Sequence, residues 1–508
     1  MKRSLKIAIG ILIGMGLLAL ALLFLNSYVE GNIKTALENN LDRVNASYKE
    51  VDVKLLDRKA EVIQPTFSIR GKTLEVDTIS LDNIKLWKYL TSKDIIAGDL
   101  NISNPVIRVY NLPKKKEKDS AAPKKNPQFE KNILLEKVII NGGSFQIFEK
   151  DSSRHRLYTS INQIRMQEVR INSGSLKEAV PFNYDLLFFK ADSIFYNLDP
   201  RHEMTAADFS IANDKVLVRD LRIIPKYSKA GHQKTISVEA DRYDLVIDSV
   251  SLNNLRWSVQ NDTVNVRNSF AEITGVNFNI YRDRTQPDDT TYKPLYSEMI
   301  RSLPIKLSID SLHLNRTFIR YEEFIKEGRD AGIVEFSALS GKIRNITNIG
   351  MGDEDFPKTV VTAQARFMRT APLYVNWEFY INDRSDAFQI SGDMGGLPAT
   401  EMNKFLKPAM NILAEGEVKQ MDFNYSGNNN QASGNMKLEY KDFKLEVLRK
   451  DGQRKNKVVS AIANLFVKDK TLNEEAEYKD ISFTRDKTKS FWNYFWNLIR
   501  KGALKTFI

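Results

Sequence analysis

Apolar and polar side chains alternate along much of the chain, and this alternation predicts β-strands. The clearest runs are residues 305–310, 373–382 and 436–447. A strand with one apolar face and one wet face is typical of an antiparallel sheet. The apolar face of these runs carries Ile309, Leu373, Val375, Trp377, Phe379, Ile381 and Leu438.

A weak internal repeat connects several of these runs. Residues 100–110 (LNISNPVIRVY) align without gaps on residues 138–148 (VIINGGSFQIF). Residues 312–321 form a third copy that is one residue shorter, and residues 169–176 form a partial fourth. Each copy reads as a strand, a tight turn and a strand, which predicts a β-hairpin repeated many times. Repeated hairpins build an elongated antiparallel sheet instead of a compact fold.

The first thirty residues predict a membrane anchor. An uncharged apolar run, Ile7–Leu25, follows basic residues at positions 2, 3 and 6. The run is about as long as a helix needs to cross ~30 Å of hydrocarbon. Basic residues before it place the N-terminus in the cytoplasm and the bulk of the chain outside it. A cleaved signal peptide is the alternative, because Ala19–Ala21 resembles a cleavage site, although the apolar run continues past it.

Helical periodicity is confined to short segments. Apolar residues recur at helical spacing in Val29–Val44, Leu295–Ser302, Thr400–Leu413 and Val458–Val467. Between the predicted strands, residues 113–127 are rich in lysine and broken by prolines. This composition predicts a flexible exposed loop that is solvated or touches anionic head groups.

The C-terminal segment 489–507 predicts an amphipathic helix. Its aromatic residues fill one broad arc of the helix, and its basic residues fall mainly on the other side. This combination is typical of a helix at a membrane interface. An amphipathic helix that caps the end of the sheet explains the same pattern, and the sequence leaves both interpretations open. The candidate membrane-interface residues are Phe491, Trp492, Phe495, Trp496, Arg500 and Lys501.

Composition narrows the chemistry available to the chain. It has 508 residues, a net charge of +11 and no cysteine, which excludes disulfides, zinc–thiolate sites and thiol catalysis. Lysine and arginine are spread along the strands and form no patch, so nucleic acid is not an expected partner. The four histidines lie in separate segments, and no phosphate-binding loop or nucleophile elbow is present. We therefore expect no metal, no cofactor and no enzymatic activity.

Four features occur together in one known family. They are an N-terminal anchor with a following short helix, and strand–turn–strand units that end in an aromatic residue, as in VIRVY at 106–110. The most specific is FQISGDMGGLPATEMNKFLKP at 388–408, continued by AEGEVKQMDF at 414–423 and ASGNMKLEYKDF at 432–443. The last is the closing FWNYFWNLIRKG at 491–502. Together they resemble the AsmA-like family of Gram-negative bacteria, and the closing segment is similar to the tail of its Bacteroidetes members.

The resemblance implies an inner-membrane-anchored periplasmic protein. Its sheet is expected to bend into a groove lined by apolar side chains, similar to the eukaryotic bridge-like lipid-transfer proteins. The resemblance implies phospholipid or another membrane lipid as the ligand, with membranes and possible envelope proteins as partners, and a role in lipid transport and outer-membrane integrity. It brings no catalytic residue. The seven apolar residues named above are then candidate groove-lining residues.

Two alternatives remain open at this point. The candidate lining residues could instead fill a closed β-sandwich core, because periodicity does not separate a groove from a core. The protein could also be a non-catalytic scaffold that binds outer-membrane assembly components through exposed sheet edges.

The predicted fold is mainly β: an elongated antiparallel sheet of repeated hairpins, curved into an apolar groove, with an N-terminal transmembrane helix and a few short helices. We predict five regions. They are a cytoplasmic tip and anchor at 1–28, a short helical cap at 29–50, a repetitive β region at 51–387, a C-terminal β region at 388–450 with a helix at 400–413, and a helical tail at 451–508.

Overall fold

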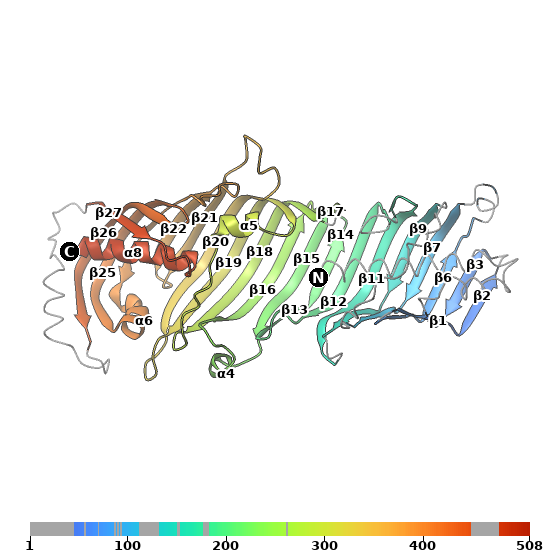
Figure 1. Ribbon diagram of the computed structural model, residues 1–508, viewed down its shortest axis with the longest axis horizontal. Helices are drawn as coiled ribbons and strands as arrows, with labels where there is room; N and C mark the ends of the chain where they lie inside the picture. The colour runs from blue at the N-terminus through green and yellow to red at the C-terminus, as the bar shows by residue number, and fades with distance from the viewer. Residues whose placement is uncertain are drawn as a thin grey trace, which may run out of the picture. The chain divides into compact units, whose positions relative to one another are not determined.

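The computed structural model describes residues 45–54, 57–69, 71–85, 88, 91, 94–110, 132–149, 153–175, 182–260, 263–448 and 477–507. These residues are mainly β, with 27 strands in one large mixed sheet and few helices (Figure 1). The chain divides into two compact units. The first contains the described residues up to Asp220 and those of Trp257–Val264, and the second contains Leu221–Arg256 and the described residues from Asn265 onward.

The first unit is built from two arms of sheet that meet at one long strand. The arm β2–β3–β6–β7–β9 ends on residues 163–171 of β11, and the arm β1–β4–β5–β8–β10 ends on residues 155–160 of the same strand. Buried aliphatic side chains from both arms form one hydrophobic core. The strands are β1 (Asn45–Ser47), β2 (Glu50–Lys54), β3 (Lys59–Ile63), β4 (Thr66–Ile69), β5 (Lys72–Glu75), β6 (Thr78–Asp82), β7 (Ile95–Ser103), β8 (Val106–Val109), β9 (Ile133–Asn141), β10 (Ser144–Phe148), β11 (His155–Ile171), β12 (Leu186–Tyr196), β13 (His202–Ala206), β14 (Asp208–Ala212), β15 (Lys215–Pro225) and β17 (Arg256–Gln260).

The first two repeated units are corners, and the prediction that they form hairpins is wrong. In these two copies the chain leaves one arm, turns, and enters the other arm, from β7 to β8 and from β9 to β10. The third copy, residues 312–321, lies within one continuous strand, Lys306–Phe324. The first two copies pair in parallel, with Leu100 opposite Val138 and Ile107 opposite Phe145. The residues that pair in the sheet are therefore the same residues that align without gaps in the two sequence copies. Gly143 adopts φ +108° at the second corner, where a Cβ would lie 2.4 Å from the Pro105 carbonyl oxygen, so glycine is required there.

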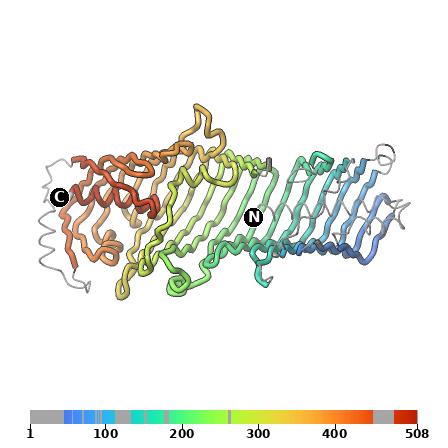
Figure 2. The backbone as a smooth tube through the Cα atoms, in the orientation of Figure 1, coloured from blue at the N-terminus to red at the C-terminus, as the bar shows by residue number. Residues whose placement is uncertain are grey.

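The second unit is a succession of long strands that lie side by side (Figure 2). Their order is β16–β18–β19–β20–β21–β22–β23–β25–β26–β27, and every neighbouring pair is antiparallel except β18–β19. The strands are β16 (Asp241–Asn253), β18 (Thr263–Asp283), β19 (Lys306–Phe324), β20 (Gly332–Thr347), β21 (Thr359–Phe367), β22 (Ala371–Phe379), β23 (Phe388–Met394), β24 (Leu397–Pro398), β25 (Ile412–Gly427), β26 (Gln431–Val447) and β27 (Lys479–Thr484); the helices are α4 (Lys229–Gln233), α5 (Tyr296–Arg301), α6 (Ala399–Met410) and α8 (Phe491–Phe507).

Parallel pairing of β18 with β19 requires a crossover connection, and residues 284–305 provide it. The crossover contains α5, which confirms the helix predicted at 295–302. Leu295, at the start of α5, is buried in the core of the second unit. Arg301, at the end of α5, donates to Asp386 Oδ1 at 2.8 Å and to the Ile381 carbonyl oxygen at 2.6 Å. The crossover is therefore fixed to the loop between β22 and β23.

The structure corrects one predicted strand direction and several predicted boundaries. The sheet was predicted to be antiparallel and is mixed, because β7–β9, β8–β10 and β18–β19 are parallel. The first strand among the described residues begins at Asn45, within the region predicted to be a helical cap, and Asn45–Ser47 pairs with β4. The helix predicted at 400–413 ends at Met410, since Asn411 adopts a left-handed conformation (φ 60°) that terminates it. The tail is not wholly helical, because it contributes β27.

The anchor at 7–25, the helix at 29–44, the loop at 113–127 and the helix at 458–467 lie outside the described residues. Among the helices that the structure does describe, none combines the length and the apolar character that crossing a membrane requires.

Candidate functional site

One face of the second unit's sheet is apolar from β16 to β26. Residues that pair directly on neighbouring strands point to the same face, so a row of paired residues can be followed from strand to strand. The first such row is Leu252, Ala271, Leu312, Ile343, Val361, Trp377, Ile390 and Tyr425. The second is Leu245, Phe278, Ile319, Phe336, Phe367 and Ala371.

Both rows lie on the same face, although the alternation changes phase between them. On β22, Ala371 and Trp377 are six residues apart and therefore point the same way. On β18, β19 and β20, a residue with positive φ stands between the rows: Gly275 (φ 72°), Arg316 (φ 51°) and Ala338 (φ 48°). At each kink the strand turns over by one residue position. Residues an odd number of positions apart, such as Ala271 and Phe278, therefore lie on the same face on either side of the kink.

Helix α8 covers this face on β22–β27. Phe491 stacks on Trp377 with ring centroids 4.5 Å apart, and Phe495 meets Phe423 edge-on at 5.4 Å. Tyr494 and Leu498 belong to the same core and are fully buried. These residues recur every three or four positions, as expected for a helix with one buried face. Of the two interpretations of this segment, the structure shows the helix that caps the sheet. Contact of α8 with a membrane remains a proposal.

The crossover completes this cover on the same face of the sheet (Figure 1). The Tyr296 ring contacts the Trp377 ring at 5.4 Å, and its hydroxyl accepts a hydrogen bond of 2.9 Å from Trp492 Nε1. Lys489, just before α8, forms an ion pair of 2.8 Å with Asp288 of the crossover. We call residues 284–305 together with α8 the cover.

Most apolar side chains of the same face are only half-buried on β16, β18 and β19, although Ala271 and Ile247 are buried. On β23–β26, by contrast, paired residues of this face such as Ile390, Tyr425 and Met436 are fully buried. We call the less buried part the half-buried apolar face. It consists of Leu245, Val250 and Leu252 of β16; Ile273, Phe278 and Ile280 of β18; and Leu312, Leu314 and Ile319 of β19.

The candidate lining residues fall into three groups. Leu373 and Val375 are half-buried against the core, whereas Phe379, Ile381 and Leu438 are buried within it. Trp377 lies between them, under Phe491. Ile309 is half-buried and pairs with Ile346 of β20. Asn345 (φ 61°) separates this pair from Leu312 and Ile343 and exchanges the phase of the alternation as the other kinks do, so Ile309 stays a candidate residue of the same face.

The half-buried apolar face was missed by sequence reasoning. Its strands do not alternate cleanly, because Leu245 and Ile247 are followed by Val250 and Leu252 in the opposite phase. A search for two alternating apolar segments separated by an odd number of positions, as Ile247 and Val250 are, would have found it. The glycine at position 275 was the available signal, because a glycine inside a strand often marks a bulge or a bend. In the structure a Cβ at this position would lie 1.9 Å from the Asp248 carboxylate.

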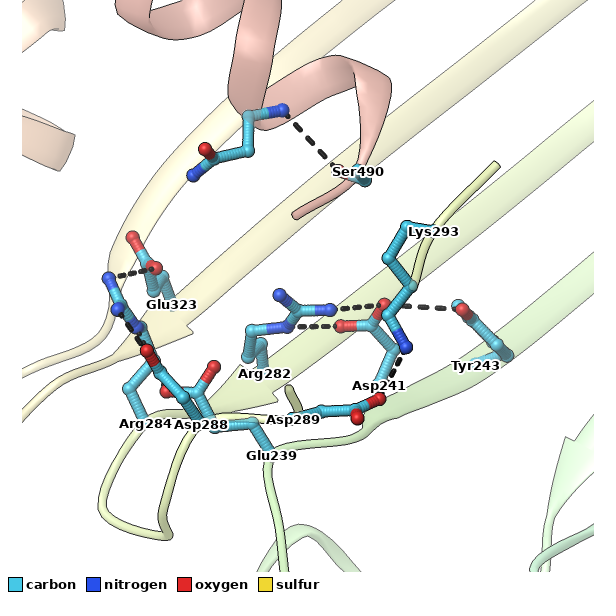
Figure 3. Close-up of polar contacts among 11 residues, drawn as sticks. Glu239, Asp241, Tyr243, Arg282, Arg284, Asp288, Asp289, Lys293, Glu323 and Ser490 are labelled. Atoms are coloured by element: carbon cyan, nitrogen blue, oxygen red, sulfur yellow. Dashed lines mark hydrogen bonds and ion pairs between the residues drawn. The ribbon is translucent and has the colours of Figure 1, made fainter. Parts of the chain in front are cut away.

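The apolar face ends in a row of charged residues at one end of the strands (Figure 3). Asp241, Arg282 and Glu323 pair directly across β16, β18 and β19. Arg282 donates to both carboxylate oxygens of Asp241, at 2.7 Å and 2.9 Å. Tyr243, one position inward on the same face, donates to Asp241 Oδ2 at 3.2 Å.

The first residues of the crossover extend this polar row. Arg284 donates to Glu239 Oε1 at 3.1 Å and to Glu323 Oε1 at 3.3 Å. The Glu239 side chain is 5% exposed, so its carboxylate is largely removed from water. Arg284 is the counter-ion that offsets this loss of solvation. The backbone N–H of Glu239 donates to the Pro287 carbonyl oxygen at 2.8 Å. The polar row thus joins the sheet to the cover.

Burial and ion pairing shift the pKa values of this row in different directions. Burial raises the pKa of Tyr243 and of Tyr321, so both phenols stay protonated. Burial acts to lower the pKa of Arg282, but the hydrogen bonds and charge of Asp241 outweigh it and the pKa rises. Burial raises the pKa of Glu323, and the positive charges of Arg284 and Arg282 oppose that change only in part.

The buried Glu335 and the partly buried Glu323 are expected to change the protein's stability in opposite directions when their charge is removed. Hydrogen bonds from Arg369 lower the pKa of Glu335 from its ordinary value of 4.5, so its stabilising contribution is present above that value and lost as pH falls through the folded-state pKa. For Glu323 the pKa is raised, so stability falls as pH rises through 4.5 to the folded-state value. At pH 7, Glu335→Gln should lower the melting temperature, and Glu323→Gln should raise it.

Thermal unfolding of the two variants against the parent at pH 7 and at acidic pH measures this difference. The gap between the variants should close in acid, where both glutamates are protonated. Equal destabilisation by both variants at pH 7 would contradict the inference that burial raises the pKa of Glu323.

No group of three or more His, Asp or Glu side chains within the described residues has the arrangement of a metal site. In comparisons with known proteins, no protein-family model matches the chain and no curated protein matches it.

Proposed function

We propose that this protein binds membrane lipid on the half-buried apolar face and passes it along the sheet between membranes. The observation that carries the proposal is that nine apolar side chains of one sheet face remain half-buried, while the continuation of that face is sealed by α8. Soluble proteins seldom leave a contiguous apolar surface larger than a few hundred Å² exposed without a use for it.

The chemistry of a lipid suits this surface. Each CH₂ group withheld from water contributes about 0.8 kcal/mol, so an acyl chain of about sixteen carbons would cost roughly 12 kcal/mol to expose fully. In our proposal the second unit's sheet curves around the half-buried apolar face and forms a groove. Acyl chains would lie across the rows of β16, β18 and β19, and the polar row at Asp241, Arg282 and Glu323 would mark the groove's wet rim.

The cover gives the groove one closed side. Trp377 and Phe491 seal the face at β22, and the crossover holds α8 in place through Tyr296 and Asp288. Lipid would therefore occupy the β16–β19 side of Trp377. This revises the candidate lining: Leu245, Phe278, Leu314 and their neighbours take the place of Trp377 and Leu438.

The expected cellular setting follows the resemblance to the AsmA-like family. We propose a single-pass inner-membrane protein with its N-terminus in the cytoplasm and its β body in the periplasm, without catalytic activity, that moves phospholipid towards the outer membrane. The competing interpretation is a scaffold that binds an envelope protein partner through its sheet.

Lipid extraction separates these two functions. The full chain is purified in detergent from a Gram-negative host, transferred to lipid-free amphipol, and examined by native mass spectrometry. The proposal expects phospholipids that remain bound to each chain through exchange into amphipol. A folded preparation free of lipid would favour the scaffold and reject the groove.

A further inference from the structure

Large apolar side chains are exposed on the helices that cover the sheet. Trp492 and Trp496 of α8 are 55% and 38% exposed. Met299 of α5 and Met410 of α6 are also exposed. The opposite side of α8 already fills the core, so the exposure of its two tryptophans does not follow from the packing of the helix.

Contacts join the two tryptophans of α8 to the neighbouring helices α5 and α6. Trp492 Nε1 donates to Tyr296 OH, three residues before Met299, which joins α8 to α5. The Trp496 ring meets the Phe405 ring edge-on at 5.8 Å, which joins α8 to α6. We call Phe405, Trp492 and Trp496 the aromatic helix surface.

The helices that present this surface are basic. α6 and α8 together carry five basic residues and one acidic residue, Glu401, for a net charge of +4. Lys407 and Arg500 are exposed near Phe405 and Trp496 in the sequence, and Lys404 is exposed but forms an ion pair with Glu401. The other two, Lys501 and Lys505, donate to backbone carbonyl oxygens of β27.

We infer that the aromatic helix surface docks on an anionic lipid bilayer. Tryptophan is favoured at the level of the lipid head groups, where its ring is partly apolar and its N–H is polar. Basic residues beside it are attracted to anionic lipid. The surface thereby gives the proposed groove a place to meet a membrane.

The test uses the full chain in nanodiscs, with an environment-sensitive fluorophore on a single introduced cysteine. The natural chain has no cysteine, so Asn493→Cys reports only on α8, and Glu327→Cys reports on the exposed turn between β19 and β20. Added phosphatidylethanolamine–phosphatidylglycerol vesicles should shift the emission to the blue at position 493 and leave position 327 unchanged. High salt and all-phosphatidylcholine vesicles should both weaken the shift.

Matched variants then assign the effect to the tryptophans. Trp492→Ser combined with Trp496→Ser should weaken vesicle binding roughly tenfold. Tyr374→Ser, which removes a 52% exposed aromatic from the opposite face of β22, should leave it unchanged. No emission change at position 493, or a change that survives loss of both tryptophans, would overturn the inference. The readout is independent of lipid on the half-buried apolar face, so either proposal can fail alone.

Discussion

Replacing Leu498 with Asp is expected to detach α8 and to expose the apolar rows that it covers. Leu498 is 0% exposed and packs in the core formed by α8 and β22–β27. A carboxylate there would be buried without a partner, and the leucine's packing would be lost as well. We expect a loss of more than about 4 kcal/mol of unfolding free energy. A reduced melting temperature and rapid proteolysis of the C-terminal segment would report it.

The matched control for this change is Arg500→Asp. It lies two positions later on the same helix, is exposed, and also introduces a carboxylate. Its effect on stability should stay within about 0.5 kcal/mol. Equal melting temperatures for Leu498→Asp and Arg500→Asp would mean that α8 does not cover the sheet in solution.

Replacing Leu245 with Glu is expected to remove most of the bound lipid while the protein stays folded. Leu245 is half-buried, so a carboxylate at this position can reach water and the cost to folding is moderate. The same carboxylate would stand in the path of an acyl chain, where its desolvation opposes lipid binding. We expect roughly fivefold less phospholipid per chain, measured by extraction and mass spectrometry.

Val246→Glu is the control for that experiment. Val246 is the next residue in β16, is equally half-buried, and points to the other face of the sheet. It should destabilise the protein to a similar degree and retain its lipid. Similar lipid loss from both variants would show that the effect comes from general destabilisation and not from the apolar face.

The sequence predicted the β character, the α5 helix and the amphipathic α8 helix, because each depends on local periodicity. It also located the gapless repeat, whose offset is the parallel register of β7 with β9. It did not predict that the first two repeat units are corners, because a strand–turn–strand pattern is the same whether the two strands pair with each other or with the neighbouring copy.

The candidate site could be predicted only in part. Leu373 to Phe379 lie on a straight strand, so period-two reasoning placed them correctly on one face. It failed at Leu245 and Phe278, because kinks near Asp248 and Gly275 exchange the phase of the alternation. The position of α8 over Trp377 depends on contacts between residues more than a hundred positions apart, which no local pattern encodes.

The polar row was also beyond sequence reasoning. Asp241, Arg282 and Glu323 are about forty residues apart in the chain, and only the pairing of three strands brings them together. Each alone resembles an ordinary solvated charge at the end of a strand.

Photo-crosslinking in growing Gram-negative cells tests lipid occupancy most directly. A benzophenone amino acid is placed at Leu245 or Leu314 of the half-buried apolar face, and at Val246 or His313 as the control on the other face. After irradiation, mass spectrometry identifies the adducts. Lipid binding predicts phospholipid adducts from Leu245 and Leu314, with few or none from the controls. Adducts that are absent from Leu245 and Leu314, or equally frequent at all four positions, would contradict it.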